Sequence, residues 1–123
     1  MVSRTLIMAS LVASMFALVA VPASAGGSYG ALAHSDSTGG FGWAVNLPSQ
    51  SAANRSALSK CGGAGCSIVT EFWKTCAAYA VGQNGIWGWA TDRNRDHVKH
   101  RAVRNCSTHG AGCKVSVWAC TGH

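Results

Sequence analysis

The stretch Gly40-Phe41-Gly42-Trp43-Ala44 returns 46 residues later as Ile86-Trp87-Gly88-Trp89-Ala90. In both copies large apolar residues alternate with glycine or alanine, which is the period of a β-strand. Working outward, the corresponding pairs of apolar and cysteine positions are Ala53/Val98, Ala57/Ala102, Leu58/Val103, Cys61/Cys106, Cys66/Cys113, Trp73/Trp118 and Cys76/Cys120. We therefore interpret the chain as a single domain made of two repeats, at about 29–76 and 77–120.

Each copy has the pattern strand, turn, strand, helix, strand. The strands are expected at 29–34, 40–45 and 67–73 in the first copy, and at 77–81, 86–90 and 114–119 in the second. Two extended runs joined by a short glycine-containing loop predict a hairpin at the start of each copy. Ser49 or Ser51 is expected to cap the first helix, and Thr91 or Asp92 the second. The sequence thus predicts an α+β fold built from a duplicated ββαβ unit.

Both helices carry a narrow apolar stripe, which must be buried against something. We expect an antiparallel-rich sheet with the two helices packed on one face. Phe72 and Val117 are expected to point towards the helices, and Trp73 and Trp118 towards the opposite face. The order of the strands does not follow from the pattern.

Residues 1–25 have the features of a secretory signal peptide. Arg4 precedes the apolar run 6–21, and Ala23-Ser24-Ala25 predicts cleavage after Ala25. An uncleaved membrane anchor is the alternative, but the run is shorter than the roughly 20 residues that span a bilayer. We expect a secreted protein, periplasmic or extracellular, whose domain at 26–123 has no transmembrane segment.

The composition excludes several classes of protein. The 123 residues are 48% hydrophobic and 11% charged, which argues against a disordered chain or a coiled coil. Six cysteines in a small exported domain predict disulfides. The short loops between the helices and the last strands predict the pairs Cys61–Cys66 and Cys106–Cys113. The remaining pair, Cys76–Cys120, is expected to join the two copies near their pseudo-two-fold axis, with a free thiol as the alternative.

At this point the chain resembles a family of small exported bacterial proteins described as domain of unknown function 4189. The resemblance extends from Tyr29 to Cys120. The matching residues are Gly30, Trp43, Cys61, Cys66, Trp73, Cys76, Gly82, Gly85, Trp87, Trp89, Cys106, Cys113 and Trp118. It implies secretion and a disulfide-rich α+β domain, and it implies no established catalytic residue or cofactor. The second helix is strongly basic here, whereas helices of the family usually carry acidic residues.

That basic helix is the clearest candidate for a binding site. Its segment 92–105 reads DRNRDHVKHRAVRN. The candidate binding residues are Arg93, Arg95, His97, His100, Arg101 and Arg104, together with Trp87. Basic helices bind anionic partners, although a solvated helix face is the plain alternative. Export disfavours nucleic acid, so we expect an anionic component of the cell envelope or an acidic protein as partner, with the oligomeric state open.

No motif indicates catalysis, and we assign no catalytic residue, cofactor or metal. Asp92 and Asp96 suit the start of a helix. His97 and His100, three residues apart, could hold a metal ion, but the surrounding cations oppose it. Glu71 shares a strand face with Val69 and Trp73, and an exposed or edge position on that face is the plain alternative to a functional role.

Three functions stay open. The favoured one is a non-enzymatic binding or interaction module that uses the basic helix. The second is an inhibitor or immunity-type protein that blocks an acidic enzyme cleft. The third is a hydrolase with an unrecognised site, which a cluster of Glu71 with His34 or His109 in a cleft would indicate.

Overall fold

The computed structural model describes residues 27–122, so the expected signal peptide lies outside the described residues. The elements are β1 (Tyr29–Ser35), β2 (Phe41–Leu47), α1 (Gln50–Cys61), β3 (Cys66–Trp73), β4 (Cys76–Val81), the 3₁₀-helix η1 (Gln83–Gly85), β5 (Trp87–Asp92), α2 (Arg95–Ser107) and β6 (Lys114–Cys120). Within the described range, no helix is long and apolar enough to cross a membrane.

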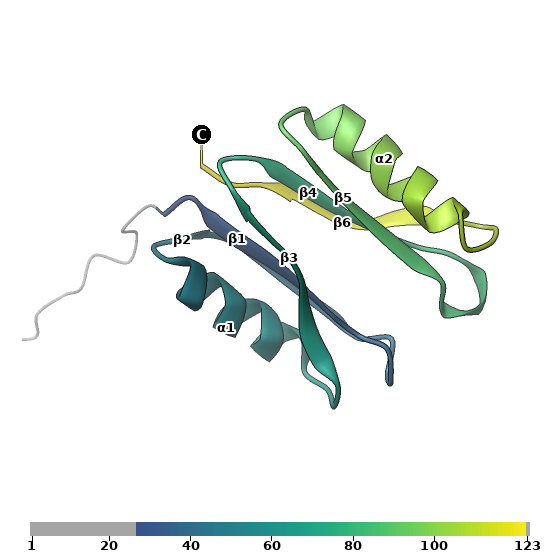
Figure 1. Ribbon diagram of the computed structural model, residues 1–123, viewed down its shortest axis with the longest axis horizontal. Helices are drawn as coiled ribbons and strands as arrows, with labels where there is room; N and C mark the ends of the chain where they lie inside the picture. The colour runs from purple at the N-terminus through teal and green to yellow at the C-terminus, as the bar shows by residue number, and fades with distance from the viewer. Residues whose placement is uncertain (1–26, 123) are drawn as a thin grey trace, which may run out of the picture.

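The six strands form two antiparallel sheets. The first sheet has the order β2-β1-β3 and the second the order β5-β4-β6. Each helix packs on its own sheet, α1 mainly on β1 and β2, and α2 mainly on β4 and β5. The result is four layers in the order helix, sheet, sheet, helix (Figure 1). The α+β class and the antiparallel pairing are confirmed.

The division into two sheets corrects the expectation of one sheet with both helices on the same face. The reason lies on the side of each sheet that its helix leaves uncovered. Leu32, Phe72 and Tyr79 point from that side and are all buried. Because large apolar side chains there need shielding from water, the two sheets cover each other. The two helices consequently end up on opposite outer surfaces.

Small side chains fill the layer between each helix and its sheet. Ala31, Ala33 and Ala44 face Ala53 and Ala57 of α1. The matching layer of the second half consists of Cys76, Ala78, Ala80, Ala90, Val98, Ala102 and Cys106. Small residues let the helices approach closely, so the bulky residues are left for the space between the sheets.

The expected directions of four residues on β3 and β6 are therefore wrong. Phe72 closes against Gly30 on the inner side of the first sheet, and Val117 lies opposite Tyr79. Trp118 instead lies under the ammonium group of Lys99 on α2, 4.0 Å from the ring centroid. By the same alternation Trp73, which pairs with Tyr29, is on the helix side of the first sheet. The alternation separates two faces correctly, but it does not say which face meets the helix.

The structure contains the disulfides Cys61–Cys66, Cys106–Cys113 and Cys76–Cys120, the same three pairs that the sequence predicts. The location of the third differs from the expectation. Cys76 and Cys120 are opposite residues of β4 and β6, so they join two strands of the second sheet and do not link the two halves. Cys76 opens β4, and its side chain is part of the second half.

Candidate functional site

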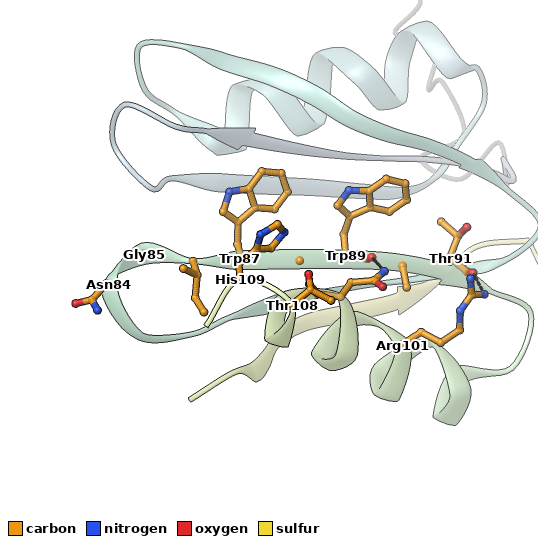
Figure 2. A pocket seen from close by; sticks show the side chains of 12 residues that line it. Asn84, Gly85, Trp87, Trp89, Thr91, Arg101, Thr108 and His109 are labelled. Carbon is orange, nitrogen blue, oxygen red and sulfur yellow. Dashed lines mark hydrogen bonds between the residues drawn. The ribbon is translucent and has the colours of Figure 1, made fainter. Parts of the chain in front are cut away.

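An open groove of about 770 Å³ runs along the exposed edge of β5 and the C-terminal half of α2 (Figure 2). Its lining side chains are Asn84, Ile86, Trp87, Trp89, Ala90, Thr91, Arg101, Asn105, Thr108 and His109, with Gly85 and Gly88. We call this the edge groove. Its volume is typical of small-molecule sites, and it combines aromatic surface with a few polar groups, as such sites do.

The strand β5 supplies the aromatic side of the edge groove. Trp87 and Trp89 are two residues apart and therefore project from the same face of the strand. Figure 2 shows their indole rings beside each other, pointing away from α2. Gly88, between them, faces α2, and a Cβ there would overlap the backbone of Cys106. The alternation of tryptophan and glycine thus gives β5 one aromatic face and one face on which a helix can lie.

The helix α2 supplies the polar side. Val98, Ala102 and Cys106 are its buried stripe, which turns Arg101 and Asn105 towards the edge of β5. Asn105 Nδ2 donates a hydrogen bond to the Trp89 carbonyl at 2.6 Å, and Arg101 Nη1 donates one to the Thr91 carbonyl at 2.9 Å. Two outward-facing carbonyl groups of this edge strand are therefore already satisfied by side chains of α2.

The start of α2 differs from the expectation. The cap is Asn94, whose Oδ1 accepts hydrogen bonds from the backbone N–H groups of Asp96 and His97. Thr91 and Asp92 still belong to β5, so they lie too early in the chain to cap the first turn. In the first half Ser49 caps α1, one of the two expected residues, by accepting from the Ala52 N–H.

Asp92 has a different role at this corner of the molecule. Its carboxylate accepts a hydrogen bond from the backbone N–H of Asn94 and forms an ion pair with Arg101 at 3.2 Å. These contacts, led by the Asn94 hydrogen bond, hold the pKa of Asp92 below its ordinary value of 3.8. The carboxylate stays charged and neutralises Arg101.

The remaining candidate basic residues project from the surface of α2 and the turn before it. We call Arg93, Arg95, His97, His100 and Arg104 the basic face; all five residues are exposed. Within residues 27–122, none of these five side chains takes part in an ion pair. The structure thus separates the predicted binding residues into two groups. Arg101 and Trp87 line the edge groove, whereas the basic face remains available to solvent.

Trp87 is seated against a buried histidine of the other sheet. The ring of His34 stacks on the indole with 3.9 Å between centroids. His34 Nδ1 is 2.8 Å from the Tyr79 hydroxyl, and its Nε2 is 3.2 Å from the carboxylate of Asp36. Burial, and in second place the charge of Asp36, raise the pKa of Tyr79 to about 12. With a neutral phenol on one ring nitrogen and a carboxylate on the other, His34 is held in one orientation beneath Trp87.

The groups that would indicate a hydrolase do not share one site. Glu71 accepts a hydrogen bond from Asn54 on α1, His34 is buried between the sheets, and His109 lines the edge groove. Across the described part of the chain, no three histidine, cysteine, aspartate or glutamate side chains are grouped as a metal site would require.

Sequence reasoning missed Asn105 and Thr108, and it considered His109 only for hydrolysis. Arg101 and Asn105 are four residues apart, which places them on one flank of α2, and His109 lies in the turn that follows the helix. This periodicity was available in the sequence. The contact of that flank with the edge of β5 was not, because it depends on the direction of the helix across the sheet.

Comparisons with known proteins agree with this architecture. The family model described as Domain of unknown function (DUF4189) matches residues 29–120, which include every helix and strand described above. The NMR structure of Rv1813c from Mycobacterium tuberculosis is similar, with 27% sequence identity and a TM-score of 0.61. That match covers 98% of this chain and 99% of the other. No curated protein matches the chain significantly.

Proposed function

The chain belongs to the family described as Domain of unknown function (DUF4189), and we propose that it is an exported, non-enzymatic binding module that recognises an anionic partner through α2. The family description assigns no activity, so the proposal depends on the distribution of charge in the molecule. The expected signal peptide and the three disulfides support export, because disulfides persist in oxidising compartments.

The observation that carries this proposal is the unbalanced charge of the basic face. The whole chain has four acidic residues against ten lysines and arginines. Asp36 is used by His34, Asp92 by Arg101, and Glu71 by α1. Asp96 is therefore the one carboxylate left near the basic face. Exposed cations without partners attract anions over a distance of about 10 Å at moderate salt.

Charge reversal on the basic face tests the proposal. Arg95→Glu with Arg104→Glu is the test variant, because both side chains are exposed and neither forms an ion pair among residues 27–122. Arg55→Glu with Lys114→Glu is the matched control, since both residues are exposed, lie on α1 and β6, and change the net charge equally. The probe is fluorescent dextran sulfate, with uncharged dextran for comparison, and binding is followed by anisotropy at increasing salt.

The expected result is salt-dependent binding of dextran sulfate that weakens about tenfold or more in the test variant. The control variant should bind within about twofold of the unmodified domain. Equal weakening in both variants would mean that net charge alone is responsible and would overturn the assignment to α2. Stoichiometric capture of one acidic enzyme from an envelope extract, with loss of that enzyme's activity, would instead favour the inhibitor.

A further inference from the structure

The edge groove has two parallel rows of groups with matching spacing. Trp87 and Trp89 repeat about 6.7 Å apart along β5, and Arg101 and Asn105 about 6 Å apart along α2. The hydrogen bonds from Asn105 and Arg101 to the backbone carbonyls of Trp89 and Thr91 hold the polar row against the edge of β5, and the indoles project from the opposite side of this strand. A ligand lying along this edge would therefore meet the indoles on one side of β5 and the polar groups of α2 on the other, each at a repeat of about 6 to 7 Å.

Several polar atoms of the edge groove have unused hydrogen-bonding capacity. Asn105 uses its amide nitrogen on the Trp89 carbonyl, and its amide oxygen has no partner among residues 27–122. In the same range, the imidazole of His109 makes no hydrogen bond, and Arg101 uses one of its two Nη atoms. These groups can accept from and donate to hydroxyl groups of a ligand.

An open strand edge such as that of β5 can also bind a peptide as an added strand. Such binding relies on free N–H and C=O groups along the edge. Here the Trp89 and Thr91 carbonyls already accept side-chain hydrogen bonds, and the donors Asn105 and Arg101 occupy the space beside them. Side chains that cover an edge in this way oppose strand pairing. A ligand that brings its own hydroxyl groups and a flat apolar face fits the groove better.

Sugar rings have this combination of groups. The C–H face of a pyranose packs on an indole, which offers a large rigid apolar surface, and its hydroxyls pair with amide, imidazole and hydroxyl groups. One face of Trp87 is already covered by His34, so the opposite face or the ring edge is what Trp87 can offer. The basic face, adjacent on α2, favours sugars that carry carboxylates, whereas Arg101 is already paired with Asp92 and offers further N–H donors only.

We propose that the edge groove binds a linear acidic glycan, with its sugar rings on Trp87 and Trp89 and its hydroxyls on Asn105 and His109. This inference depends on the proposed function, since it names the class of the anionic partner. The edge groove binds the sugar rings, and the basic face attracts their carboxylates.

The test uses two probes with one backbone, polygalacturonate oligosaccharides and their methyl esters, and poly-aspartate as a polyanion without sugar rings. Trp89→Ala removes one indole, and His109→Ala changes an exposed residue whose side chain makes no hydrogen bond among residues 27–122. Trp73→Ala is the matched control, because Trp73 is 54% exposed and lies outside the edge groove. Affinities are measured by calorimetry, and NMR spectra of the indole N–H groups locate the contact.

We expect polygalacturonate to bind in preference to poly-aspartate and to shift the indole signals of Trp87 and Trp89. Trp89→Ala should weaken binding about tenfold or more, and His109→Ala about threefold to tenfold. Trp73→Ala should change nothing, and the methyl ester should bind more weakly with the same indole signals shifted.

Two other results would overturn the glycan assignment in different ways. Equal binding of poly-aspartate and polygalacturonate, unaffected by Trp89→Ala and His109→Ala but lost on reversal of Arg95 and Arg104, would leave the proposed function standing and remove the glycan. Failure of all the polyanions to bind would remove both proposals.

Discussion

The imidazole of His34 and the hydroxyl of Tyr79 meet 2.8 Å apart across the space between the two sheets. Both residues are almost fully buried, at 5% and 1% exposure. The contact joins the central strand of one sheet to the central strand of the other. It also fixes the ring on which Trp87 stacks, so the fit of the two sheets and the shape of the edge groove depend on the same pair.

This pair predicts an alkaline transition in stability. The pKa of Tyr79 is raised from 10.0 to about 12 by burial and by Asp36. Between these values the unfolded chain loses a proton that the folded protein retains, so the free energy of unfolding falls as the pH rises from 10 to 12. Urea unfolding at a series of pH values measures it. Tyr79→Phe should flatten the pH dependence in this range, and an unchanged slope would contradict the assignment.

The disulfides Cys76–Cys120 and Cys61–Cys66 are predicted to contribute differently to the free energy of unfolding. Cys76–Cys120 joins residues 44 apart in sequence, whereas Cys61–Cys66 joins residues 5 apart. From the entropy of loop closure, removing the first should cost about 4 kcal/mol and removing the second about 2 kcal/mol. The variants Cys76→Ser/Cys120→Ser and Cys61→Ser/Cys66→Ser, compared by urea unfolding, test this. A larger loss for the short loop would show that native packing, and not the unfolded chain, decides the effect.

The register of the sheets explains why the location of the third disulfide could not be predicted from the sequence. The sequence places Cys76 and Cys120 in corresponding positions of two copies. In the sheets, however, Tyr29 and Trp73 have the pairing in the first half that Cys76 and Cys120 have in the second. An aromatic pair with centroids 6.5 Å apart thus stands where the second half has its disulfide. Aligned by the register of the sheets, Trp73 of β3 corresponds to Cys120 of β6. The sequence repeat instead matches Trp73 with Trp118, which is two residues earlier.

Predictions of local structure succeed here wherever a short-range pattern decides the outcome. The alternation around Trp43 and Trp89 predicts strands, and the four-residue spacing of Val98, Ala102 and Cys106 predicts the buried stripe of α2, as the structure has it. The division into two sheets and the edge groove depend on contacts between distant segments. The groove residue Asn105 acquires its role from a carbonyl group sixteen residues earlier in the chain, and no local pattern indicates that contact. That the halves arose by duplication stays a prediction from the sequence.

The absence of a side chain at Gly88 allows α2 to lie close to β5. A Cβ at this position would overlap backbone atoms of Asn105 and Cys106, so Gly88→Ala should force the helix away from the strand. We expect the free energy of unfolding to fall by about 3 kcal/mol or more, and the hydrogen bond between Asn105 and the Trp89 carbonyl to weaken. Gly85→Ala is the control, because nothing lies within 4 Å of its Cβ and the cost is confined to its positive φ, about 1 kcal/mol. Thermal unfolding of both variants, together with the amide signal of Asn105, compares them. Equal losses would show that α2 does not need this close approach.

The ion pair between Arg101 and Asp92 predicts how acidic pH affects this end of the edge groove. The pKa of Asp92 is lowered first by the Asn94 backbone hydrogen bond and then by Arg101. Arg101→Ala should therefore raise this pKa only in part and leave it below 3.8, because the Asn94 N–H remains in place. The stabilisation from ionised Asp92 is complete above that ordinary value and is lost as the pH falls through the lowered pKa. An NMR titration of the Asp92 carboxyl carbon measures the shift, with Arg104→Ala as the control that leaves Asp92 unchanged. If Arg101→Ala returned the pKa fully to 3.8, the guanidinium and not the turn would be what holds Asp92 charged at the end of β5.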